Sequence, residues 1–370
     1  MKYRLGNICK IGDGLHGTPN YCKNNEFYFI NGNNLKGELI DLSNARSVSK
    51  AEYLKYNPNL IPQKTVLLSI NGTLGNTAIY NGESIILSKS VAFFECSTDI
   101  ITPEYLKLYF ESCNFQNILN NMATGTTIKN VGLKSLRSLM IDLPSINIQR
   151  EIVNIIKPFE NKLYLNNQIN DNLMKLNTLL FQQLSVDSDY TLSNFTDCQN
   201  GFAFKSSEYI TNNELLILRT LNMTSDHLFS KNGVKYISKV YKEKYQKFEF
   251  KKFDTTLVMV GASIGKMALI TTNVIPSLQN QNMWRFRSKS KMPGLLIYDM
   301  VQYVNDRVRS SATGSARSFY RKKMFLNSKV PVISEKYYDI FLAIQEKINN
   351  IANENETLSN LKNVLLSKYF

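Results

Sequence analysis

Two stretches decide how this chain is organised: LLSINGTLGNTAIY at residues 67–80 and VMVGASIGKMALIT at residues 258–271. Each places an apolar run on both sides of a glycine loop, and aligning Gly75 with Gly265 gives an offset of 190. Three further pairs keep the same order: Ala-Thr-Gly at 123–125 and 312–314, Leu-Pro at 143–144 and Val-Pro at 330–331, and LMKLNTLL at 173–180 and LSNLKNVL at 358–365. Because chance rarely preserves the order of four such pairs, the sequence predicts a tandem duplication.

Each half has the same predicted anatomy. A mixed globular part comes first, in which short β-rich runs such as TVLLSI (65–70) and SVAFFEC (90–96) are separated by Gly and Asn turns. A long helical stretch then closes each half. The predicted fold class is therefore α+β, divided into a globular domain (1–146), a helical spacer (147–186), a second globular domain (187–333) and a second helical spacer (334–370).

Apolar residues recur every three or four positions in both helical stretches, as on one face of an α-helix. They are Ile148, Ile152, Ile155, Phe159, Ile169, Leu173, Leu176 and Leu180 in the first, and Phe341, Ile344, Ile348, Ile351, Leu358, Leu361 and Leu365 in the second. Pro158 predicts a kink in the first helix, or a split into a short lead-in helix and a main one. Each helix is the obvious partner for the other, and Asn166 and Asn355 either set the register of an antiparallel coiled coil or face solvent.

Antiparallel pairing would hold the two globular domains at opposite ends of a spacer. A helix of about 35 residues is roughly 50 Å long, which corresponds to about 15 base pairs of duplex. Two DNA readers on such a spacer would recognise two short sequences separated by a gap of constant length, as the spacing of dimeric readers sets the spacing of their half-sites.

Charge supports a nucleic-acid partner. The formal net charge is +14 and the pI is about 9.3, which indicates DNA, RNA or an anionic membrane, or simply a lysine-rich surface. The most apolar window, 256–275, carries Lys266 among Gly and Ser, which favours strand, loop and strand over a membrane span. Five scattered cysteines, two histidines, no CxxC and no apolar leader predict a cytoplasmic protein with reduced thiols and no zinc site.

The order of the motifs resembles that of the specificity subunits of type I restriction–modification systems. In the first half the resemblance is carried by DGLHGTPNY (13–21), GTLGNTAI (72–79) and GTTIKNVGLKSLRSLMIDLPSINIQREI (125–152). In the second half it is carried by NGFAFKSSEY (200–209) and GASIGKMALI (261–270). The second half departs from the pattern after Val330-Pro331, where SEKYYDIF replaces the Gln-x-x-Ile of the first half. This departure puts the packing of the second helix in doubt.

The resemblance implies a function and a set of partners. It implies two target recognition domains that read different short sequences, because the two globular parts differ greatly. It also implies a non-catalytic subunit that docks two methyltransferase subunits onto double-stranded DNA, with restriction subunits as optional further partners. No cofactor is expected on this chain, since S-adenosylmethionine, ATP and Mg would belong to the partner subunits.

The sequence independently favours a chain without catalysis. It has no Pro-Pro pair, whereas an amino-methyltransferase carries an Asn/Asp-Pro-Pro-aromatic motif. GASIGK (261–266) lacks the first Gly and the final Ser/Thr of a phosphate-binding loop. Glu249-Phe250-Lys251 with Asp226 is a weak nuclease pattern, so a nuclease or a degenerate fused restriction–modification enzyme is the alternative. A coiled-coil scaffold whose charge is incidental is a third interpretation.

Candidate DNA-binding residues follow from base chemistry, because Asn and Gln suit adenine whereas Arg and Lys suit guanine. In the first half they are His16, Thr18, Asn31, Asn33, Asn34, Lys36, Asn71, Thr73, Asn76, Thr126 and Lys129. In the second half they are Lys205, Arg219, Asn222, Ser263, Lys266, Gln279, Asn280, Gln281, Arg317 and Arg321. Two basic windows, 235–252 and 307–323, fit phosphate contact or a solvated charged face. No catalytic residue or metal ligand is predicted, and Trp284 is expected in the core.

Overall fold

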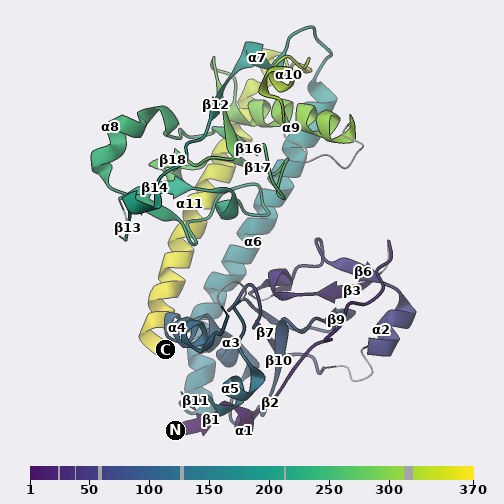
Figure 1. The fold of residues 1–370 in the computed structure, drawn as a ribbon, viewed down its shortest axis with the longest axis vertical. Helices are drawn as coiled ribbons and strands as arrows, with labels where there is room; N and C mark the ends of the chain where they lie inside the picture. Colours follow the sequence, from purple (N-terminus) through teal and green to yellow (C-terminus); the bar gives the residue numbers. More distant parts are fainter. Residues whose placement is uncertain (24–25, 38, 57–60, 126–128, 212–213, 312–319) are drawn as a thin grey trace. The chain divides into compact units, whose positions relative to one another are not determined.

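The computed structural model describes the chain except residues 24–25, 38, 57–60, 126–128, 212–213 and 312–319. The described chain forms two compact units. Unit 1 contains residues 1–162 and 359–370, and unit 2 contains residues 163–358. Two long helices, α6 (Ile146–Leu184) and α11 (Tyr338–Tyr369), contribute residues to both units (Figure 1).

Unit 1 is built on an antiparallel sheet of order β2-β10-β7-β8 and a smaller sheet of order β6-β3-β9, in which β3 and β9 run parallel. Its strands are β1 (Lys2–Arg4), β2 (Cys9–Asp13), β3 (Phe27–Ile30), β4 (Leu35–Lys36), β5 (Leu39–Ile40), β6 (Arg46–Val48), β7 (Val66–Ser69), β8 (Thr77–Ile79), β9 (Ile85–Leu87), β10 (Val91–Cys96) and β11 (Met140–Asp142). Its shorter helices are α1 (Leu5–Ile8), η1 (Gly32–Asn34), α2 (Lys50–Tyr56), α3 (Pro103–Glu111), α4 (Cys113–Met122) and α5 (Leu133–Ser138).

Unit 2 has a sheet of order β12-β19-β16-β17 and a second sheet of order β13-β15-β14-β18. Its strands are β12 (Thr196–Asn200), β13 (Tyr209–Ile210), β14 (Leu215–Leu218), β15 (Lys235–Ile237), β16 (Thr255–Val258), β17 (Met267–Leu269), β18 (Ser277–Gln279) and β19 (Met283–Ser288). Its other helices are α7 (Leu192–Phe195), η2 (Ser206–Glu208), η3 (Thr220–Asn222), η4 (Lys239–Tyr241), α8 (Lys242–Tyr245), η5 (Gln246–Phe248), η6 (Thr272–Val274), α9 (Gly294–Ser311), α10 (Lys322–Leu326) and η7 (Glu335–Tyr337).

The two units repeat one topology. Their first sheets match strand for strand, and each second sheet contains one parallel pair, β3 with β9 and β14 with β18. The two glycine loops that opened the sequence analysis connect β7 to β8 and β16 to β17. The prediction of a tandem α+β fold is therefore confirmed.

The glycine loops repeat in detail. Gly75 and Gly265 have φ angles of +85° and +86°, which residues with a Cβ rarely adopt. The carbonyl of Gly75 accepts a hydrogen bond from Gln116 Nε2 at 3.0 Å, and that of Gly265 accepts one from Asn305 Nδ2 at 3.0 Å. Each loop is thus held against a helix of its own unit by an equivalent amide.

The cores lie between the first sheet of each unit and its helices. In unit 1, α3 packs against β7 and β8, and its start is stabilised by Thr102, whose hydroxyl accepts from the amide of Tyr105, and by Pro103 in the first turn. In unit 2, α9 packs against β16, β17 and β19. Trp284 on β19 is 2% exposed and belongs to this core, as expected from the sequence.

The face that α6 buries overlaps the predicted stripe only in part, since Ile152 is buried and Phe159, Leu173 and Leu180 are half-buried. Ile148, Ile155, Ile169 and Leu176 of the predicted stripe are exposed. The buried positions are Gln149, Ile152, Ile156, Glu160, Asn166, Asn170, Met174, Asn177 and Phe181. Five of these nine buried side chains are polar, so apolar periodicity alone could not find most of the buried face.

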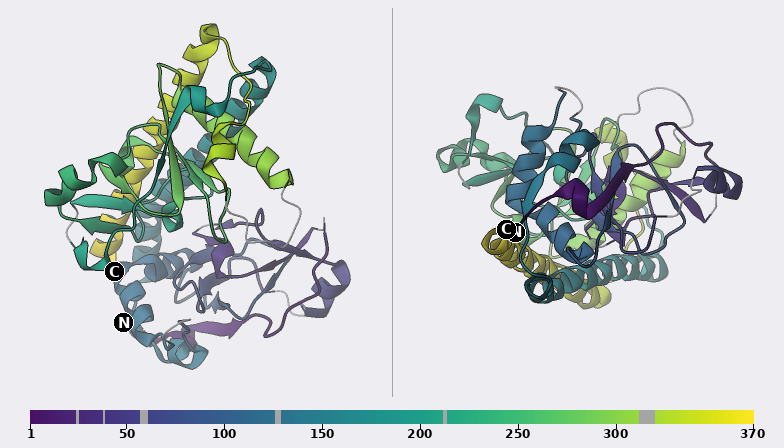
Figure 2. Two further views of the ribbon diagram at one scale, coloured as in Figure 1. Left: turned by 45° about the horizontal axis from the view of Figure 1, so that its top comes forward. Right: turned by 90° about the horizontal axis from the view of Figure 1, so that it is seen from below.

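The α6 helix is continuous through Pro158, so the predicted split is wrong. Of the two alternatives for Asn166 and Asn355, a contact between the helices is observed within unit 2, because Asn166 Nδ2 donates to Asn355 Oδ1 and to Glu354 Oε2, both at 2.8 Å. In unit 1, Lys362 near the end of α11 contacts Glu160 of α6. A later residue of α6 contacts an earlier residue of α11, so the helices pair antiparallel. They lie side by side within each unit (Figures 1 and 2).

The Gln-x-x-Ile pattern that the second half lacked is present further along the chain. Gln149 on α6 accepts a hydrogen bond from the amide of Thr102 at the start of α3 (3.1 Å). Gln345 on α11 accepts one from the amide of Leu295 at the start of α9 (3.3 Å). Both glutamines are buried, and each is followed three residues later by a buried isoleucine. The second helix therefore makes the same type of contact as the first. None of the described helices is long and apolar enough to cross a membrane.

Candidate nucleic-acid interface

The predicted DNA-binding residues of unit 1 gather where strands β2, β3 and β7 end. The amide of Leu15 donates to the carbonyl of Leu87 (2.7 Å), and the amide of Lys89 donates back to Leu15 (3.0 Å). The amide of Ser88 donates to the carbonyl of Ile30 (2.9 Å). These three bonds join the ends of β2 and β3 to the β9–β10 turn, and we call this group edge 1.

Polar side chains are linked along edge 1. Thr73 Oγ1 donates to Asn33 Oδ1 (2.7 Å), and Asn76 Nδ2 donates to the carbonyl of Gly32 (2.9 Å). Asn71 Nδ2 donates to Asn130 Oδ1 (3.1 Å). The glycine loop 71–76 is thereby joined to the turn that follows β3, as a surface that contacts DNA from several loops requires.

The same backbone bonds recur in unit 2. The amide of Phe202 donates to the carbonyl of Gln279 (3.1 Å), and the amide of Gln281 donates back to Phe202 (2.9 Å). The amide of Asn280 donates to the carbonyl of Leu218 (3.1 Å). This group, edge 2, matches edge 1 bond for bond, although the two edges carry different side chains.

Three candidates are structural residues and were wrongly predicted as base readers. Gln279 is fully buried, and its Nε2 donates to the carbonyls of Gln199 and Met283. Asn34 and Asn222 are buried at the last residues of η1 and η3, where each side-chain oxygen accepts from the backbone amide three residues earlier. These amides stabilise turns instead of facing solvent.

The other candidates differ in exposure. His16, Thr18, Asn31, Asn33, Lys36, Thr73, Lys129, Lys205, Ser263, Gln281 and Arg321 are exposed, and Asn71, Asn76, Arg219, Lys266 and Asn280 are half-buried. Several already have partners: His16 Nε2 lies 2.8 Å from Asp13 Oδ2, and Lys266 Nζ donates to the carbonyl of Met223 at 2.6 Å. Thr126, Arg317 and the second Ala-Thr-Gly stretch lie outside the described residues.

The basic window 235–252 forms β15, η4, α8 and η5, and it is tethered by two arginines that the sequence analysis missed. Arg287 donates to both carboxylate oxygens of Asp254, at 2.7 and 2.6 Å. Arg285 and Arg287 also donate to the carbonyl of Glu249, at 2.8 and 2.9 Å. Burial, together with the nearby Arg287, lowers the pKa of Arg285. Since both arginines alternate with apolar residues on β19, only strand periodicity signals their inward-facing role.

All seven lysines of this window are exposed: Lys235, Lys239, Lys242, Lys244, Lys247, Lys251 and Lys252. Lys244 is paired with Glu208 at 3.2 Å, and Lys252 with Glu346 at 2.7 Å. The window thus presents a net positive surface next to a rigid tether, which suits contact with phosphates.

Comparisons with known proteins agree with this geometry. The family described as "Type I restriction modification DNA specificity domain" matches residues 1–175. The EcoBI specificity subunit of Escherichia coli is 28% identical over 38% of this chain, and the MjaVIII specificity subunit of Methanocaldococcus jannaschii is 22% identical over 80%. A solved S subunit of a type I restriction–modification system from M. genitalium shares the fold, with a TM-score of 0.50, 14% identity and coverage of 100% of this chain and 96% of that one.

Residues 1–175, slightly less than half of the chain, are thus similar to the DNA specificity domain of type I restriction–modification systems. The matches cover 30% of the E. coli subunit and 73% of the M. jannaschii subunit.

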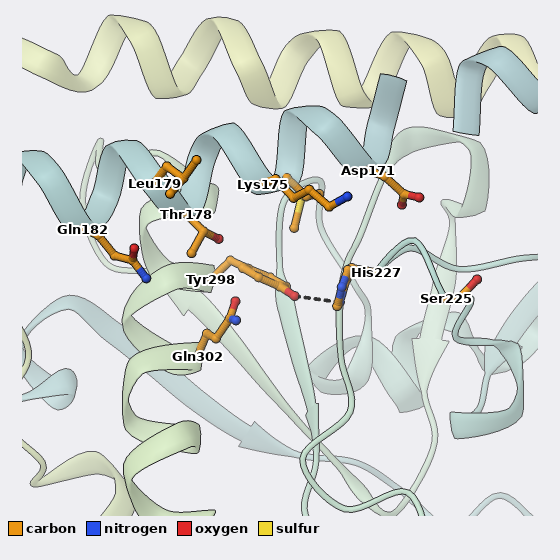
Figure 3. A pocket seen from close by; sticks show the side chains of 10 residues that line it. Asp171, Lys175, Thr178, Leu179, Gln182, Ser225, His227, Tyr298 and Gln302 are labelled. Carbon is orange, nitrogen blue, oxygen red and sulfur yellow. Dashed lines mark hydrogen bonds between the residues drawn. The ribbon is translucent and has the colours of Figure 1, made fainter. Parts of the chain in front are cut away.

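A cavity of unit 2 lies between α6 and α9 (Figure 3). The cavity has a volume of about 560 Å³, and the Tyr298 hydroxyl lies 3.0 Å from His227 Nδ1 at its wall. Burial raises the pKa of Tyr298. Among the described residues no three His, Cys, Asp or Glu side chains are grouped so that they could hold a metal ion.

Proposed function

We propose that this chain recognises a bipartite double-stranded DNA sequence, one block through each unit. The observation that carries the proposal is the pair of edges, which share one set of backbone bonds but display different side chains. A repeated scaffold with altered surface residues suits the reading of two different short sequences. The excess positive charge and the exposed lysines of window 235–252 supply the sequence-independent attraction to phosphates.

The two blocks are proposed to be separated by a gap of constant length. The α6 and α11 helices each contribute to both units, and their register is held by specific polar contacts such as Asn166 with Asn355. Buried polar pairs of this kind disfavour sliding of one helix along another. A constant register supports a constant gap.

We further propose that the chain directs two methyltransferase subunits, and restriction subunits where present, to that sequence in the cytoplasm. Large apolar side chains remain exposed on α6 at heptad-like spacing in unit 2: Leu165, Ile169, Leu176 and Leu179. An apolar stripe of this kind suits a partner helix. S-adenosylmethionine, ATP and Mg are proposed to bind the partner subunits and not this chain.

A methylation map tests the proposal. The chain is expressed with its methyltransferase subunit in a host that lacks other adenine methylation, and the genomic DNA is sequenced for modified adenines. The expected result is one split motif with two specific blocks and an unspecified gap of constant length. A motif with one block would remove the reading role of one unit, and no methylation by a verified complex would reject the guide function.

Binding of the purified chain separates the remaining alternatives. DNA affinity that falls steeply with salt supports a DNA-recognition role, because bound phosphates release counterions. A scaffold protein would show no such dependence. Cleavage of DNA by the purified chain, abolished by Glu249→Gln, would instead indicate a nuclease.

A further inference from the structure

The matched edges define equivalent positions in the two units, among them five pairs that carry an exposed polar side chain in unit 1. The repeated backbone bonds and the aligned glycine loops give these pairs: His16 and Ala203, Asn31 and Arg219, Asn33 and Leu221, Thr73 and Ser263, and Lys89 and Gln281. A position that reads bases in both units needs a side chain with suitable donors or acceptors in each, exposed to solvent and free to contact DNA.

Two pairs fail because one member cannot read bases by hydrogen bonding. Ala203 and Leu221 have no polar side-chain atom. Their counterparts in unit 1 are also engaged, since His16 contacts Asp13 and Asn33 accepts from Thr73.

Two more pairs are engaged in turn structure in at least one unit. Asn31 Oδ1 accepts from the amide of Asn33 (2.9 Å), and Arg219 Nη2 donates to the carbonyl of Gly233 (2.5 Å). Thr73 is held by Asn33, so only Ser263 remains in that pair.

Of these five pairs, Lys89 and Gln281 is the pair that satisfies every condition. Lys89 and Gln281 are exposed, and within the described chain neither side chain has a hydrogen-bond or ion-pair partner. Their backbones are nevertheless held, because each amide donates to the strand end opposite, Leu15 in unit 1 (3.0 Å) and Phe202 in unit 2 (2.9 Å). A backbone that is already held reduces the entropy lost on binding, and an unengaged side chain can contact a base without breaking an internal hydrogen bond.

We propose that Lys89 and Gln281 are equivalent specificity-determining residues, with Lys89 reading guanine in one block and Gln281 reading adenine in the other. This inference rests on the proposed function. Lysine donates to the O6 and N7 acceptors of guanine, and glutamine pairs with N6 and N7 of adenine in the major groove. The sequence analysis included Gln281 but missed Lys89, because a single lysine between two serines carries no motif.

Reciprocal substitutions test the inference. Methylation maps are compared for the unaltered chain, Lys89→Gln and Gln281→Lys, each in complex with the methyltransferase subunit. Lys89→Gln is expected to change one guanine to adenine in one block, and Gln281→Lys one adenine to guanine in the other. Discrimination at that base should change by about 10- to 100-fold, while the unaltered block acts as an internal control for folding.

Lys134→Gln is the matched control, because Lys134 is an exposed lysine of the same unit on α5, away from edge 1. It should leave the motif unchanged. Where a variant loses methylation, selection of bound duplexes from a random library by the complex gives the same readout.

The outcomes separate the two proposals. A split motif that is the same for the unaltered chain and both variants overturns the inference alone. A uniform loss of binding by Lys89→Gln, without a change of base, shows a phosphate contact and also overturns it. If the unaltered chain gives no split motif, the proposed function fails first.

Discussion

The two units join their sheets and shorter helices to the long helices with opposite chemistry. In unit 1, Lys107 and Glu111 of α3 meet Glu160 of α6 and Lys362 of α11 in one buried ionic cluster. Lys362 Nζ lies 2.6 Å from Glu111 Oε2 and 2.5 Å from Glu160 Oε1, and Lys107 contacts both glutamates. With two positive and two negative groups, the cluster is neutral as a whole.

In unit 2 a single carboxyl group takes this place. Asp299 of α9 is buried and accepts from Asn177 Nδ2 (2.6 Å) and Thr178 Oγ1 (3.3 Å) of α6, and no cation of the described residues contacts it. Burial raises its pKa to about 8, against the opposing effect of the two hydrogen bonds. One fold therefore tolerates either paired charges or a protonated acid at the same type of interface. This comparison shows why the repeat is visible in the backbone but weak in the sequence.

The largest expected effect comes from breaking the ionic cluster. Lys362→Met leaves two buried carboxylates with one lysine, and it should destabilise unit 1 by about 3–5 kcal/mol. Hydrogen exchange of unit 1 peptides measures the loss, while unit 2 peptides serve as the internal reference.

Lys157→Met is the matched control, because Lys157 is exposed on α6 within the same unit. It should change stability by less than about 0.5 kcal/mol. Equal protection in the Lys362→Met and Lys157→Met variants would show that the cluster is not important for unit 1.

The second prediction concerns the pH dependence of stability, which should have opposite signs in the two units. Burial disfavours ionisation of Glu111, but attraction to Lys107 and Lys362 outweighs it and lowers the pKa to about 2. Its contribution is therefore present at neutral pH and lost as the pH falls from about 4.5 through 2. Asp299, with a raised pKa, stabilises unit 2 most when protonated, and this contribution declines as the pH rises from about 4 to about 8.

The slope for unit 2 should approach, at most, about 1.4 kcal/mol per pH unit. Asp299→Asn replaces the acid with a neutral group of the same shape and should remove that slope. The measurement is hydrogen exchange of unit 2 between pH 5 and 8, corrected for the intrinsic rate. An unchanged slope in the variant would assign the pH dependence to other groups.

The sequence predicted the parts of this fold that depend on local pattern. The glycine loops, the strands around them and the two long helices follow from alternation, turn residues and helical period. The buried face of α6 does not, because Gln149, Glu160 and Asn177 are buried by virtue of partners on distant elements. Such partners leave no periodic signal in the chain.

The candidate site shows the same limit. The sequence placed readers on the loops that do form edges 1 and 2, yet it chose Asn34, Asn222 and Gln279, whose amides stabilise the turns. It missed Lys89, since the importance of this lysine comes only from its bond to a strand end 74 residues away. Residue type predicts binding chemistry, whereas tertiary hydrogen bonds decide which side chains remain available.

The third prediction compares the two buried glutamines. Gln149 accepts from Thr102 and donates to the carbonyls of Ile100 and Pro144, whereas Gln345 is involved in one longer bond at the start of α9. Gln149→Leu should therefore cost unit 1 about 2–3 kcal/mol, and Gln345→Leu should cost unit 2 about 1 kcal/mol. Denaturant titrations of both variants test the order, and a larger loss for Gln345→Leu than for Gln149→Leu would contradict it.

The smallest effect should be a gain in stability within unit 2. Asn170 is fully buried on α6, and within the described chain neither of its amide atoms has a hydrogen-bond partner. Replacing it by Leu removes an unmatched polar group at similar volume, so Asn170→Leu should stabilise unit 2 by about 1 kcal/mol. The matched variant is Asn166→Leu, which leaves Glu354 and Asn355 without their shared donor and should destabilise the same helix pair. Thermal unfolding of both variants decides the point: if both lose stability alike, Asn170 has a partner, such as a buried water, that makes its amide as necessary as that of Asn166.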